Sequence, residues 1–195
     1  MIKKILLGIF ILIGLISCTN DDDNNNFQEE AICDSSNTSF NQLYNDLSAS
    51  TSIQDEITMD LETHSYDFEV LESKTICQIG YQSLQNFNST PYLIEIFDNT
   101  SSTLLYSDSH IFSSSDTEYV SITPIQVEVG HLYTIKRIQT NWNGNISNTI
   151  GRLISGNLSF PNTYGELTIT SSSFYGTGGP LDDWGIPYID IVFQN

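Results

Sequence analysis

The chain has 195 residues, and 24 acidic against 6 basic side chains give it a formal net charge of −18. Basic side chains neutralise phosphates in nucleic-acid complexes, so this balance argues against a nucleic-acid partner. Alanine, the best helix former, occurs only at Ala31 and Ala49, which disfavours a helical bundle, whereas 39% hydrophobic residues disfavour disorder.

The first 17 residues have the pattern of a signal peptide. Lys3 and Lys4 precede an apolar run, residues 5–16, that is short for a membrane span. Leu15-Ile16-Ser17-Cys18 follows, and it resembles the lipobox of bacterial lipoproteins. The resemblance implies cleavage after Ser17, lipidation of Cys18 and anchoring in a membrane through the acyl chains. An ordinary secretory signal with a chance cysteine is the alternative.

Residues 18–34 are expected to form an acidic polar tether that begins at the lipidated cysteine. The stretch 19–26 is made of threonine, aspartate and asparagine and has no means of burying itself. Acids directly after Cys18 resemble the surface-export signal of lipoproteins in the Bacteroidetes group. This resemblance implies an outer-membrane protein exposed on the cell surface, and retention on the periplasmic face is the alternative.

Cys33 and Cys77 are an even pair in an oxidising compartment, so we expect them to form a disulfide. Closing a loop of about 45 residues would stabilise the fold by roughly 4 kcal/mol. The alternative is a buried free thiol at Cys77 and an unpaired Cys33. Neither cysteine has a neighbouring Cys or His at a metal-ligand spacing.

One short helix is predicted near residues 40–48. Phe40, Leu43, Tyr44 and Leu47 follow the helical spacing i, i+3, i+4, i+7 and share one face. Ser39, with Gln42 three residues later, has the pattern of a capping box.

After the helix, the hydrophobic period changes to two. Alternating segments occur at 57–61, 66–70, 77–81, 92–96, 104–106, 119–122, 125–129, 132–138, 149–154, 166–170 and 186–193. Short alternating strands at this spacing predict an all-β fold: a single antiparallel, jelly-roll-like β-sandwich over residues 35–195. Two expected loops, 141–148 and 171–185, contain both tryptophans.

The order of the segments within residues 66–138 is similar to one known group of domains. An extended strand at 66–70, a strand ending in Asp98 at 91–98 and a glycine turn after 127–129 carry the similarity. The region resembles jelly-roll domains of unknown function in bacterial secreted proteins, which sit beside carbohydrate-active and adhesive modules. The resemblance implies a binding or structural role and assigns no catalytic residue.

Few residues have the spacing of a catalytic or metal site. No Gly-x-Ser-x-Gly elbow occurs, and the three histidines, His64, His110 and His131, are expected at the surface or at strand edges. The adjacent acids Asp182 and Asp183 have three interpretations: a catalytic pair, cation ligands or solvated turn residues. We expect no cofactor, except that Asp98 or the Asp182–Asp183 pair could hold a structural calcium ion.

The aromatic residues of the two loops suggest a ligand site. Trp142 with Asn143, and Trp184 with Tyr175, combine a ring that can stack on a sugar with polar hydrogen-bond partners. The preferred alternative is that each tryptophan plugs one end of the sandwich. The sequence therefore predicts a non-catalytic binding or structural protein, with a glycan or an envelope protein as partner. A glycan-processing hydrolase that uses the loop carboxylates is the competing prediction.

Overall fold

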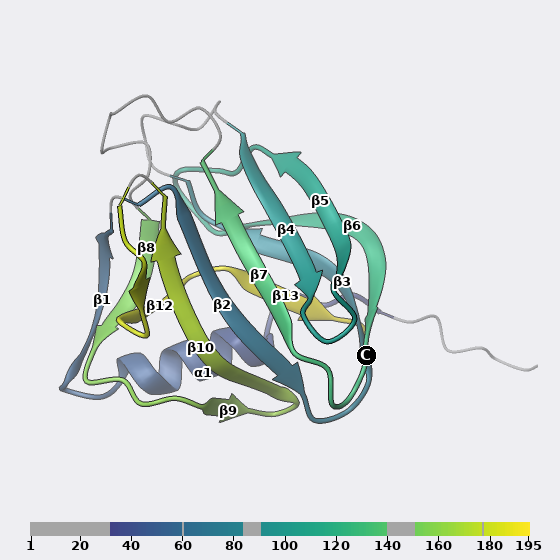
Figure 1. The fold of residues 1–195 in the computed structure, drawn as a ribbon, viewed down its shortest axis with the longest axis horizontal. Coiled ribbons are helices and arrows are strands. Elements are labelled where there is room, and N and C mark those ends of the chain that lie inside the picture. Colours follow the sequence, from purple (N-terminus) through teal and green to yellow (C-terminus); the bar gives the residue numbers. More distant parts are fainter. Residues whose placement is uncertain (1–31, 60, 84–90, 140–150, 177) are drawn as a thin grey trace, which may run out of the picture. The chain divides into compact units, whose positions relative to one another are not determined.

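The computed structural model describes residues 32–59, 61–83, 91–139, 151–176 and 178–195, all of which lie in one unit, residues 31–195. In these residues antiparallel sheets pack face to face, with one helix beside them (Figure 1). The predicted fold class, an all-β antiparallel sandwich with one short N-terminal helix, is confirmed.

Three sheets make up the sandwich, and every strand pair in them is antiparallel. The large sheet has the order β11–β10–β2–β7–β4–β5, with β9 also paired to β10. Its strands are β2 (Thr63–Val70), β4 (Tyr92–Asp98), β5 (Thr103–His110), β7 (Tyr133–Ile138), β9 (Asn162–Tyr164), β10 (Leu167–Tyr175) and β11 (Leu181–Asp182). The second sheet consists of β13 (Asp190–Phe193), β3 (Lys74–Tyr81) and β6 (Glu118–Val127). The third consists of β1 (Ile53–Thr58), β8 (Gly151–Gly156) and β12 (Gly185–Pro187).

The core lies between the sheets, and strands such as β4 point alternate residues into it. On β2, Tyr66 and Phe68 are fully buried while Glu69 between Phe68 and Val70 is exposed. Buried isoleucines of β3 and β13 belong to the same core. The period-two pattern predicted these strands because a sheet with one wet face needs polar residues at every second position.

Helix α1 (Ser39–Ser48) buries Phe40, Leu43 and Tyr44, as its spacing predicted. Its cap differs from the prediction. Thr38, and not Ser39, is the N-cap: its backbone is extended, and its hydroxyl accepts from the Asn41 N–H at 3.0 Å. Gln42 donates to the side chain of Asn37 instead of closing a capping box. Thr38 is selected because its hydroxyl also donates to buried Asp190 at 2.7 Å, a tertiary contact.

The predicted loop 171–185 is wrong in its first part, because β10 continues through Tyr175. Three consecutive serines hid the alternation. Ser171 and Ser173 lie on the wet face, where their hydroxyls donate to Asp67 and Asp182, while Ser172 is 3% exposed. Hydrogen bonds to carboxylates across the sheet thus satisfy residues that looked like turn formers.

Other strand boundaries also differ from the prediction: the segment expected at 57–61 is β1, which begins at Ile53 and ends at Thr58. The segments predicted at 119–122 and 125–129 belong to one strand, β6, which ends at Val127. Pro124 does not interrupt it, because β6 is an edge strand and Pro124 lies at a register shift, where no backbone N–H is needed to pair with β3. The single segment at 186–193 is instead split between β12 and β13, which belong to different sheets.

Candidate functional site

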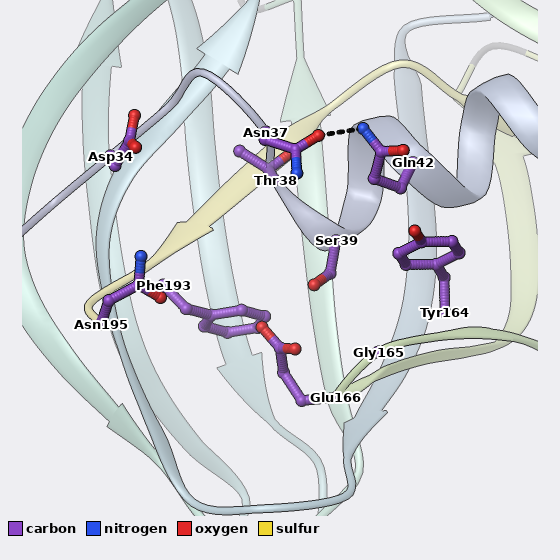
Figure 2. Close-up of a pocket in the computed structure, with 10 residues that line it drawn as sticks. All are labelled: Asp34, Asn37, Thr38, Ser39, Gln42, Tyr164, Gly165, Glu166, Phe193 and Asn195. Carbon is purple, nitrogen blue, oxygen red and sulfur yellow. Dashed lines mark hydrogen bonds between the residues drawn. The ribbon is translucent and has the colours of Figure 1, made fainter.

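A pocket of about 270 Å³ lies between the start of α1 and the turn that joins β9 to β10 (Figure 2). Its walls come from three parts of the chain that are distant in sequence: the segment before α1 with the first helical turn, the β9–β10 turn, and the end of β13. It is lined by Asp34, Asn37, Thr38, Ser39, Gln42, Tyr164, Gly165, Glu166, Phe193 and Asn195. The volume lies just below the range of about 300–1,000 Å³ that is typical of ligand sites.

The first wall is the segment 32–38, and the sheet holds it at its beginning. Cys33 and Cys77 form a disulfide with their Cα atoms 6.1 Å apart. Cys33 also forms an isolated bridge with Gln194, and the Asn195 N–H donates to the Ile32 carbonyl at 3.0 Å. This segment is therefore attached to both β3 and the end of β13.

The same segment is held at its other end by Asp190. The Asp190 carboxylate accepts from the Thr38 hydroxyl and from the Tyr119 hydroxyl, each at 2.7 Å. Burial raises the pKa of Asp190 to about 6, although both hydrogen bonds act to lower it. Thr38 is thus a structural part of the wall, with its hydroxyl engaged by Asp190 and by the helix N-terminus.

The opposite wall is the tight turn between Tyr164 and Leu167, which are paired across the hairpin. Gly165 has φ +56°, a left-handed value that glycine adopts without strain. A Cβ at this position would approach Ser39 Oγ to 3.0 Å. Glycine therefore allows the turn to lie close to the first residue of α1.

The pocket presents hydrogen-bonding groups of several kinds. Gln42 Nε2 donates to Asn37 Oδ1, which leaves the Gln42 carbonyl and the Asn37 amino group for a ligand (Figure 2). Asp34 accepts from the Ser36 N–H at 2.9 Å through Oδ1, and hydrogen bonds from Ser36 lower the pKa of its carboxyl. The Tyr164 side chain is 37% exposed.

Figure 2 shows the Glu166 carboxylate rising from the turn toward Ser39, beside the ring of Phe193. Phe193 is 6% exposed and gives the pocket an apolar floor. None of the ten described residues that line the pocket is Lys, Arg or His. The arrangement is that of a small polar site with carboxylate, amide and hydroxyl groups and one accessible aromatic ring.

The structure uses Asp98, a predicted cation ligand, to fix a turn. Its carboxylate accepts from the backbone N–H groups of Thr100 and Ser101 and from the Ser101 hydroxyl. His131 Nδ1 donates to the same group at 2.8 Å. Burial alone would raise the pKa of Asp98, but the bonds from His131, Ser101 and Thr100 outweigh burial and lower it to about 2.

Asp182 and Asp183 hold β11 against β10. The Asp183 N–H donates to the Ser172 carbonyl, and Asp183 Oδ1 accepts from the Ser172 N–H, both at 2.9 Å. Asp182 accepts from the Ser173 hydroxyl at 2.6 Å. Asp98 ends β4, which lies four strands from β11 in the large sheet, a separation of about 19 Å at the usual strand spacing. Asp98 therefore forms no common site with Asp182 and Asp183. Among the described residues, no three His, Cys, Asp or Glu side chains gather as a metal site requires.

The other predicted site residues are only partly described. Trp184 is 38% exposed in the connection from β11 to β12, and Tyr175 ends β10 opposite Thr63. Trp142, Asn143 and the lipidation site Cys18 lie outside the described residues. No helix within the described ranges has the length and hydropathy to span a bilayer.

His64 was expected at the surface or at an edge, and that prediction is wrong. Its side chain is 1% exposed and accepts at Nδ1 from Arg137, which is itself fully buried, at 2.6 Å. Burial first, and then the charge of Arg137, lower the pKa of His64 well below 6.5. The Arg137 guanidinium also lies over the rings of Tyr92 and Tyr81, at 5.3 and 5.8 Å. The imidazole therefore serves as a neutral acceptor within the core.

No protein-family model and no curated protein matches this chain. The sequence did not predict this pocket, because positions 34–42, 164–166 and 193–195 carry no shared motif. The one local signal is the Tyr-Gly-Glu run at 164–166, which marks a turn with an aromatic residue before it.

Proposed function

We propose that this protein is a lipid-anchored component of the bacterial outer membrane that binds a neutral saccharide, without catalysis, in the pocket between α1 and the β9–β10 turn. The single observation that carries the saccharide proposal is the set of groups lining that pocket. The anchoring and the cell-surface location rest on the sequence of residues 1–26.

Sugar hydroxyls both donate and accept hydrogen bonds, so a saccharide site needs both kinds of group. The Asn37 amino group donates, the Gln42 carbonyl and the Asp34 and Glu166 carboxylates accept, and the Ser39 hydroxyl does either. An exposed aromatic ring adds a face for the apolar side of a sugar, and Tyr164 supplies such a ring.

Charge favours a neutral saccharide over an acidic one. Two carboxylates line the pocket, and no basic side chain in its described lining offsets them. The full chain carries −18, and removal of residues 1–17 makes it two units more negative, because they contain two lysines and no acid. Uronate-rich or sulfated polymers would be repelled by both the site and the surrounding field.

A binding experiment with matched aromatic variants tests this proposal. We expect the full chain, purified in detergent, to bind neutral saccharides on a glycan array and in calorimetry. Tyr164→Ala should weaken binding by about tenfold or more, which corresponds to about 1.4 kcal/mol. Trp184→Ala removes an aromatic side chain of equal exposure, 38% against 37%, and should leave binding unchanged.

Two results would contradict the proposal. One is that the unmodified protein binds no neutral saccharide. The other is loss of binding in Trp184→Ala alone, which would move the site to the β11–β12 connection. Release of reducing ends from the bound saccharide would instead support the hydrolase alternative.

A further inference from the structure

A second hollow of about 340 Å³ adjoins the pocket. It is lined by Leu71, Glu72, Gly165 and Glu166, so Gly165 and Glu166 belong to both hollows. Leu71 and Glu72 lie in the turn from β2 to β3. The β9–β10 turn is therefore a ridge that borders both hollows.

The ridge is fixed in place and carries no side chain at its first residue. The Leu71 N–H donates to the Glu166 carbonyl at 2.8 Å, which ties the β2–β3 turn to the ridge. At Gly165 a Cβ would approach Ser39 Oγ to 3.0 Å, so glycine keeps this turn close to α1. The hydrogen bond between the two turns thus holds the two hollows at a fixed spacing.

The second hollow has a chemistry that complements the first. Leu71 is 61% exposed, and it lines the hollow together with Glu72 and Glu166. Glu72 is paired with Lys74 at 2.7 Å. An apolar surface flanked by acceptors suits a sugar ring, whose faces are apolar and whose edge carries hydroxyl donors.

We infer that the ligand is an oligosaccharide of at least two units that crosses the ridge at Gly165, with one unit in the pocket and the next against Leu71. This inference rests on the proposed saccharide binding and adds the length of the ligand to it. A monosaccharide would fill only one of the two hollows.

The test is the dependence of affinity on ligand length. The full chain is titrated with neutral gluco-, manno- and chito-oligosaccharides of one to six units. We expect affinity to rise about tenfold or more from one unit to two or three, and then to level off. Leu71→Ala should abolish this rise and leave affinity for a single unit unchanged. Leu104→Ala is the matched control, since Leu104 is 51% exposed on β5, three strands from β2.

The outcomes separate this inference from the proposed function. Equal affinity for one unit and for longer chains would overturn the inference and leave saccharide binding intact. A rise with length that persists in Leu71→Ala would also overturn it, because the additional units would then lie elsewhere. Absence of binding at every length would overturn the proposed function and this inference together.

Discussion

Asp190 joins the helix, the second sheet and the pocket wall through one buried carboxylate. It is fully buried, and it accepts from Thr38 at the N-cap of α1 and from Tyr119 on β6. A buried carboxylate is costly when ionised, and burial accordingly raises its pKa from 3.8 to about 6. The residue therefore positions the wall at some expense to stability near neutral pH.

The raised pKa makes a prediction about pH. Between pH 4 and 6 the unfolded chain loses the Asp190 proton while the folded chain keeps it, so stability falls as pH rises through this window. The shift corresponds to a loss on the order of 3 kcal/mol. Asp190→Asn keeps the shape without the titration. Urea unfolding at pH 4, 5.5 and 7 should show the native chain losing stability relative to this variant. A constant difference between the two would contradict the assignment.

At the scale of elements, the segment 32–38 is held at both ends and shapes the pocket between them. The Cys33–Cys77 disulfide fixes its start, and the Thr38–Asp190 hydrogen bond fixes its end. Asp34 and Asn37 lie between these attachments and line the pocket. The segment belongs to no strand of the three sheets, so its positions depend on the disulfide together with its few hydrogen bonds to the end of β13 and to Asp190.

Removal of the disulfide should affect both stability and binding. The double variant Cys33→Ser/Cys77→Ser should lose roughly 4 kcal/mol in denaturant unfolding, because its unfolded chain is no longer cross-linked. Saccharide affinity should also fall, because a looser segment must be ordered by the ligand. Ile96→Ala in the core costs about 2–5 kcal/mol without touching the wall. Ile96→Ala is therefore the control for lost stability alone. If the disulfide variant binds the saccharide as tightly as Ile96→Ala under conditions in which both are folded, the pocket wall does not depend on the disulfide.

At the scale of the whole molecule, acidity and anchoring belong together. The net charge of −18 is spread over the tether and the wet faces of the strands. Some acids have local structural roles, such as Asp98 in its turn and Asp67 across β2, β7 and β10. The proposed lipid on residue 18 would hold this acidic domain at a membrane surface.

Replacement of Cys18 tests the proposed lipid anchor. Cys18→Ser removes the thiol that would be acylated and should shift the protein from the membrane fraction to the soluble fraction. The Cys33→Ser/Cys77→Ser variant is the control, since it removes two other sulfur atoms and should remain with the membranes. Membrane association of Cys18→Ser would contradict the lipoprotein proposal.

The sequence determined the fold class because hydrophobic periodicity is a local property. The i, i+3, i+4, i+7 spacing around Phe40 predicted α1, and alternation predicted most of the strands. Local pattern failed where a distant partner decided the outcome. Thr38 is the N-cap of α1 because its hydroxyl also donates to Asp190. Ser171 and Ser173 lie in β10 because their hydroxyls donate to Asp67 and Asp182.

The pocket depended entirely on tertiary structure. Its residues come from positions 34–42, 164–166 and 193–195, and apart from Gly165 each is an ordinary polar or aromatic residue in its own segment. The disulfide, the Thr38–Asp190 hydrogen bond, the Gly165 turn and the return of β13 beside β3 bring them together. Sequence patterns report which face of an element is buried, whereas a binding site is set by the distances between elements, and these are fixed only when the sheets pack.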